Sequence, residues 1–133
     1  MKKLFAAAAL AAMLPLMAAN PKYIFLFIGD GMGAPQVTLA SEYTRGKLTL
    51  GSLPTVGVTA TRSLNRFITD SAAAGTALAA GEKTNSGMIG QSPDGRRLES
   101  YAVRAARRGK KIGVVTSVSL DHATPAAFYA HVP

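Results

Sequence analysis

The sequence predicts an α/β fold in which helices flank a parallel sheet. Two continuous apolar runs, residues 22–28 and 111–118, lack the alternation of a half-exposed strand. Each run is therefore typical of a central strand that is covered on both faces. Residues 98–118 read as a helix, a short loop and an apolar strand, the order found in a βαβ unit.

Residues 1–19 have the pattern of a secretory signal peptide. Lys2 and Lys3 precede an apolar run over residues 4–17, and small residues follow at 18–19. This pattern predicts a secreted or periplasmic protein whose mature part, residues 20–133, is a single domain without stable membrane association. An uncleaved membrane anchor is the alternative.

We predict cleavage of the signal peptide near Ala19, because the export machinery recognises a basic N-terminus that is followed by an apolar run. N-terminal sequencing of the exported protein should begin near Asn20. Soluble periplasmic chains that still begin at Met1 would contradict this prediction.

The chain carries a net charge of +8 and has no cysteine, which excludes disulfides and thiolate metal sites. Five basic residues cluster near one another: Arg104, Arg107, Arg108, Lys110 and Lys111. Apolar residues at 98, 101, 102 and 105 have helical spacing, so residues 98–108 should form an amphipathic helix ending at Gly109. A solvated face is favoured over a nucleic-acid site, and we expect no nucleic-acid partner.

Asp30 follows the first predicted strand, between glycines that permit close approach of a ligand. Residues 29–34 satisfy a dinucleotide-binding pattern, but no acidic residue stands about 20 positions further on, where a ribose partner is expected. Asp30 is either a metal ligand or the cap of a glycine-rich turn. Pro35 suits the first turn of a helix that runs to about Arg45.

A second strand is predicted at residues 55–61, and it leads to TDSAAAGTA at residues 69–77. Asp70 and Ser71 are of the types that begin helices, and the alanines behind them favour a helix that stops at Gly81. Ser71 is either part of a helix cap or a nucleophile at a helix end that attracts anions. Gly81, Lys83 and Thr84 partly match the end of a phosphate-binding loop motif. The first glycine of that motif is missing, so we exclude a phosphate-binding loop here.

The strand at residues 111–118 is followed by Asp121, His122 and Thr124, and then by a predicted helix over residues 125–130. Polar residues at the end of a parallel strand indicate a site or an ordinary loop.

Three separated motifs together closely resemble the alkaline phosphatase family. They are IFLFIGDGMG (residues 24–33), TDSAAAGTA (69–77) and HATPAA (122–127), and FYAHV (128–132) also matches. The resemblance implies hydrolysis of phosphomonoesters with two zinc ions (Zn²⁺) and one magnesium ion (Mg²⁺). Residues 20–133 would then be the N-terminal part of the catalytic domain.

The resemblance also implies roles for individual residues. Ser71 matches the nucleophile that forms a phosphoserine, and Asp70 matches a residue that orients the phosphate-binding arginine. Asp30 matches the carboxylate that bridges zinc and magnesium. Thr124 matches a magnesium ligand, and His122 falls beside that ion.

The family's arginine and most of its zinc ligands have no counterpart in these 133 residues. We therefore expect a longer parent protein, for which a homodimer is one open oligomeric state. We also expect the sheet to be incomplete in this fragment and the fragment alone to be inactive. The alternative function is that of a secreted fragment or binding module without catalysis.

Overall fold

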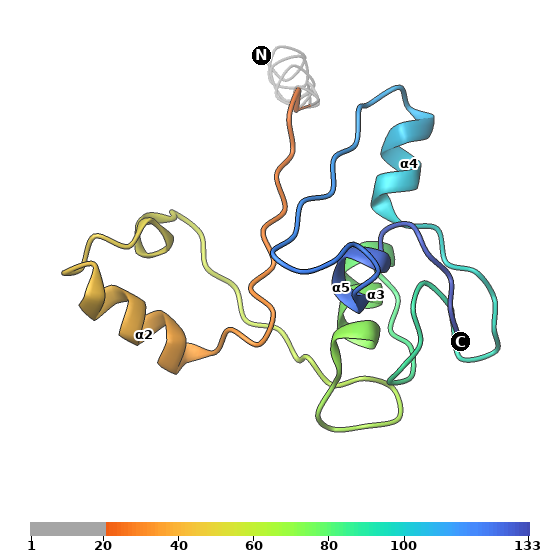
Figure 1. Ribbon diagram of the computed structural model, residues 1–133, viewed down its shortest axis with the longest axis horizontal. Helices are drawn as coiled ribbons and strands as arrows, with labels where there is room; N and C mark the ends of the chain where they lie inside the picture. The colour runs from red at the N-terminus through yellow and green to blue at the C-terminus, as the bar shows by residue number, and fades with distance from the viewer. Residues whose placement is uncertain (1–20) are drawn as a thin grey trace, which may run out of the picture.

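The computed structural model describes residues 21–133 (Figure 1). The predicted signal peptide, residues 1–19, lies outside the described residues. The elements in chain order are the helices α2 (Ala34–Tyr43), η1 (Thr49–Ser52), α3 (Ser71–Ala80), α4 (Tyr101–Arg107) and α5 (Ala123–Ala126). Helices α4 and α5 both contact α3, whereas α2 stands apart from this group in Figure 1. Within residues 21–133, none of the helices has the length and hydropathy needed to cross a lipid bilayer.

The three predicted strands run as extended chain but form no sheet within residues 21–133. The pairing found there consists of two isolated antiparallel bridges, Ile89 with Val132 and Gln91 with Arg97. A parallel strand needs a neighbour that satisfies its backbone groups, and the three segments do not pair with one another. Most of their apolar side chains are exposed, with Val58 and Val115 almost fully so. The parallel sheet, which we expected to be incomplete in this fragment, is therefore not formed within the described residues.

Helix α3 begins and ends where the sequence predicts. Asp70 is its N-cap, with backbone in the extended region, and its Oδ1 accepts a hydrogen bond from the Ala73 N–H at 3.0 Å. Gly81 ends the helix with a φ of 76°, a left-handed conformation that favours glycine. Ser71 is thus the first residue inside the helix rather than its cap.

Small side chains let α5 pack closely on α3. The buried residues on the two helices include Ala72, Ala73, Gly75, Ala79 and Ala126. A Cβ atom at Gly75 would lie 3.2 Å from the Ala127 Cβ and 3.4 Å from the Thr124 Cα. The absence of a side chain at Gly75 therefore sets how near the backbone of Thr124 comes to α3.

Helix α5 differs from the prediction, because it covers Ala123–Ala126 instead of residues 125–130. The chain leaves helical geometry after a few turn hydrogen bonds and then runs to Val132, which exchanges two backbone hydrogen bonds of 2.8 Å with Ile89. His131 supports this pairing, with its Nδ1 2.7 Å from the Gly90 carbonyl oxygen. The tertiary pairing thus overrides the local helix preference of the alanines.

The other helix boundaries are close to those predicted. Helix α2 carries a proline in its first turn and ends at Tyr43, two residues before the expected end. Helix α4 begins at Tyr101, later than residue 98, because Ser100 caps it by accepting from the Val103 N–H. The arginines of residues 104–108 are exposed, as expected of a solvated face.

We predict that Gly75→Val destabilises the packing of α5 on α3 by about 1–3 kcal/mol, because the new side chain must displace Ala127 or Thr124. Denaturant unfolding followed by circular dichroism measures this change in the free energy of unfolding. Ala77→Val, at a half-buried position of the same helix, is the matched control and should cost only about 0.5 kcal/mol. Equal effects of the two substitutions would contradict the close-packing role of Gly75.

Candidate active site

The carboxylate of Asp30 brings together three of the residues singled out in the sequence. The Ser71 hydroxyl donates to it, with distances of 3.0 Å to Oδ2 and 3.1 Å to Oδ1. The Thr124 hydroxyl donates to Oδ2 at 2.7 Å. Ser71 and Thr124 are 41 and 94 positions from Asp30, so tertiary structure alone creates this cluster.

Each side chain of the cluster comes from a different kind of element. Asp30 lies in a turn closed by the Met32 N–H donating to the Gly29 carbonyl, and Gly31 takes a φ of 67° there. Ser71 opens α3, and Thr124 lies within α5. The packing of α5 on α3 therefore sets the separation of the two hydroxyls, and Asp30 bridges them from an extended segment.

The neighbours of Asp30 lower the pKa of its carboxyl below the ordinary range for aspartate. The hydrogen bond from Thr124 is the largest cause, the bond from Ser71 is the next, and His122 adds an electrostatic contribution. His122, the N-cap residue of α5, thus acts on Asp30 through its charge and not through a direct hydrogen bond. Asp30 is an anion that is ready to bind cations over the neutral and alkaline range.

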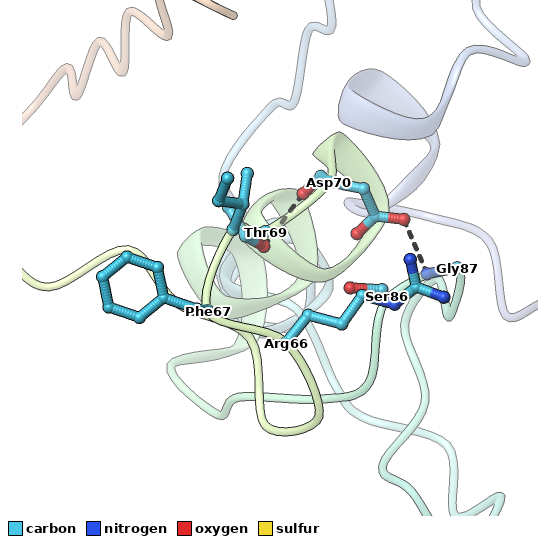
Figure 2. A pocket seen from close by; sticks show the side chains of 7 residues that line it. Arg66, Phe67, Thr69, Asp70, Ser86 and Gly87 are labelled. Carbon is cyan, nitrogen blue, oxygen red and sulfur yellow. Dashed lines mark hydrogen bonds between the residues drawn. The ribbon is translucent and has the colours of Figure 1, made fainter.

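Asp70 has a second role that the sequence did not reveal. Its Oδ2 accepts a hydrogen bond of 2.6 Å from the Gly87 N–H (Figure 2). Its Oδ1 caps α3 by accepting from the Ala73 N–H. Gly87 has a φ of 93° in a turn that the Met88 N–H closes by donating to Asn85. The Asn-Ser-Gly sequence signals a turn at residues 85–87, but it does not signal which side chain the turn contacts.

A hollow of about 690 Å³ lies beside Asp70. Figure 2 shows the Arg66 side chain reaching toward Asp70 and the turn at residues 85–88, with the Phe67 ring pointing away. The lining residues are Arg66, Phe67, Ile68, Thr69, Asp70, Ser86 and Gly87. Neither Ser71 nor Asp30 lines it, so it adjoins the hydroxyl cluster without containing it.

The donor atoms around Asp30 suit a hard cation. One carboxylate and two hydroxyl groups provide oxygen ligands only, which is the set that magnesium prefers. A zinc ion needs three or four protein ligands, with histidine and carboxylate side chains among them. Across residues 21–133 no group of three or more such residues is found, so these residues supply part of a zinc site at most.

Comparison with known proteins decides the family. The family model for alkaline phosphatase matches residues 21–133. The chain belongs to the alkaline phosphatase family. Alkaline phosphatase 4 of Bacillus subtilis is 38% identical over 85% of this chain and 26% of its own length. The alkaline phosphatase of Gadus morhua is 35% identical over 81% of this chain and 27% of its own length.

A further relative is the streptomycin-6-phosphate phosphatase of Streptomyces griseus, 37% identical over 86% of this chain and 27% of its own length. The chain thus spans about a quarter of the length of these curated relatives.

Solved structures agree with this assignment. Alkaline phosphatase from the Antarctic bacterium TAB5 superposes with a TM-score of 0.81 at 36% identity, over 85% of this chain and 33% of that one. The structure of a histidine-to-aspartate variant of the TAB5 enzyme has Mg bound in its M3 site. It also superposes on this chain with a TM-score of 0.81. The alkaline phosphatase of Thermus thermophilus superposes with a TM-score of 0.73 at 34% identity, over 80% of this chain and 24% of that one. Alkaline phosphatases have an α/β fold, so the α/β class is confirmed through these relatives.

We predict that Thr124→Val raises the pKa of Asp30 toward its ordinary value, because it removes the hydrogen bond that lowers this pKa most. A carboxyl with a lowered pKa stabilises the fold above its unfolded pKa, and the contribution disappears as the pH falls through the folded pKa. The variant should therefore lose less stability on acidification. A ¹³C NMR titration of the Asp30 carboxyl in chelator-treated protein measures the pKa directly.

Thr38→Val is the control for this titration. The Thr38 hydroxyl donates to the Ala34 carbonyl within α2 and does not contact Asp30. The control should leave the titration of Asp30 unchanged. An unchanged pKa in Thr124→Val would show that the hydroxyl of Thr124 does not hold the carboxylate in solution.

Proposed function

We propose that the protein to which this chain belongs hydrolyses phosphomonoesters through a phosphoserine formed on Ser71. The observation that carries the proposal is the position of Ser71, whose hydroxyl meets Asp30 at the start of α3 in a chain of the alkaline phosphatase family. The name of the Streptomyces griseus relative, which describes a phosphatase acting on a 6-phosphate, supports this substrate class.

In this proposal the Ser71 oxygen attacks phosphorus and the bond between phosphorus and the alcohol oxygen breaks. Water then attacks the phosphoserine, which releases inorganic phosphate and restores the serine hydroxyl. Asp30 fixes the orientation of the Ser71 side chain by accepting a hydrogen bond from its hydroxyl group. The N-terminal end of α3 presents backbone N–H groups and a positive dipole to the phosphoryl group. Asp70 keeps that first turn fixed and would also orient a phosphate-binding arginine.

We propose zinc and magnesium as the cofactors. Asp30, Ser71 and Thr124 would hold them with oxygen atoms, and His122 would tune the charge beside the magnesium ion. When bound, these cations lower the pKa of the serine hydroxyl and offset the negative charge of the phosphoryl oxygens. The described residues provide one carboxylate and two hydroxyl groups, so further ligands would come from outside them.

We also propose export to the periplasm or the medium after removal of residues 1–19, which fits a phosphatase that meets phosphomonoesters outside the cytoplasm.

We predict that Ser71→Ala in the full-length parent protein lowers kcat by more than about a thousandfold, because the nucleophile is lost. Stability should stay within about 0.5 kcal/mol, since Asp70 and not Ser71 caps the helix and alanine favours it. The assay uses a chromogenic phosphate ester at alkaline pH with zinc and magnesium, together with acid quenching to trap labelled phosphoserine.

Ser100→Ala is the matched control, a serine at the start of another helix. Ser100 caps α4 and donates to the Phe128 carbonyl at 2.6 Å, so its loss should cost about 1 kcal/mol of stability while kcat remains normal. A kcat of Ser71→Ala within about tenfold of that of the unaltered protein, or labelled phosphate still trapped on this variant after acid quenching, would refute the phosphoserine mechanism.

A further inference from the structure

Two turns are hydrogen-bonded to each other behind Asp70. In the first turn, Asn65 Oδ1 accepts from the Ser86 N–H at 2.9 Å. The same oxygen lies 3.2 Å from the hydroxyl of Ser63, a buried residue whose Oγ is 3.0 Å from that of Ser86. The turn at residues 63–66 therefore fixes the turn at residues 85–88 through side chains.

The second turn, at residues 85–88, is also hydrogen-bonded to the start of α3, the helix that carries the proposed nucleophile. Gly87, next to Ser86, donates its N–H to Asp70 Oδ2 at 2.6 Å, and Asp70 Oδ1 accepts from the Ala73 N–H. Hydrogen bonds thus connect Asn65 to Ser86 and connect Gly87 through Asp70 to the first turn of α3, and the peptide bond between Ser86 and Gly87 joins the two parts.

We propose that Asn65 is a positioning residue for Ser71, an inference that rests on the proposed function. Asn65 is exposed, and its side-chain contacts are to Ser86 and Ser63 rather than to Ser71. Without its amide oxygen, the Ser86 N–H loses its partner. The contact between the Ser63 and Ser86 hydroxyl groups and the hydrogen bond from the Leu64 N–H to the Thr84 carbonyl remain, so the turn stays nearby but is held less tightly against Asp70. The Asp70 carboxylate then keeps one of its two anchors, and the first turn of α3 loosens around the nucleophile.

The test is a double-mutant cycle in the intact protein. Asn65→Ala should lower kcat/KM for a chromogenic phosphate ester about tenfold. In the Asp70→Ala background the same substitution should change kcat/KM less than about twofold, because the connection to α3 is already broken. Effects of Asn65→Ala that are equal in both backgrounds would overturn the proposal.

Two control variants separate positioning from general damage. Asn65→Asp keeps an oxygen that accepts from Ser86 and should retain kcat/KM within about threefold. Asp94→Ala removes a side-chain oxygen that accepts from one serine hydroxyl and one backbone N–H in an exposed turn, as the Asn65 oxygen does. It should leave kcat/KM unchanged. A tenfold loss in Asp94→Ala would show that any broken turn has this effect.

Hydrogen exchange tests the connection without any reliance on activity. Asn65→Ala should speed exchange at the amides of residues 86–87 and also at those of residues 72–74 in the first turn of α3. Faster exchange confined to residues 86–87 would overturn the proposal. If the unaltered protein hydrolyses no phosphomonoester, the proposed function fails, and the exchange rates still decide whether Asn65 holds α3.

Discussion

The contact of α5 with α3 at Gly75 sets the geometry on which the candidate site depends. Because Gly75 has no side chain, the Thr124 Cα can lie only 3.4 Å from the point that a Cβ atom would occupy on α3. Ser71 opens that same helix, so one packing distance fixes two hydroxyl groups relative to each other. Asp30 can accept from both only because they are already held side by side.

Asp70 and Asp30, the two carboxylates near the start of α3, bind different kinds of groups. Asp70 binds backbone N–H groups and so stabilises the helix and the neighbouring turn, whereas Asp30 binds hydroxyl groups. Both would repel a phosphate dianion that approaches Ser71. Counter-charge is therefore a physical requirement of the proposed reaction, and bound zinc and magnesium, with an arginine oriented by Asp70, would provide it.

Local chemistry explains what could be predicted from the sequence. Asp70 and Gly81 predict where α3 begins and ends, because aspartate favours the N-cap and glycine the C-cap of a helix largely independently of the rest of the chain. The convergence of Asp30, Ser71 and Thr124 was predictable only because three motifs together resemble one family. Contacts between distant turns, such as Gly87 with Asp70, leave no local signal. The shortened α5 has the same origin, since Val132 pairs with Ile89.

Asp30 differs from the rest of the site in how its position is supported. Ser71, Asp70 and Thr124 lie on helices and caps that small buried residues and turns hold together. Asp30 follows an extended segment with exposed apolar side chains, including Phe25 and Phe27. Within residues 21–133, side-chain hydrogen bonds from Ser71 and Thr124 tie this carboxylate to the helices. In the α/β fold of the family, pairing of the extended segment into a sheet would fix the carboxylate from the other side. The site is therefore most preorganised at Ser71, the proposed nucleophile, and least so at Asp30, the carboxylate proposed to bind metal.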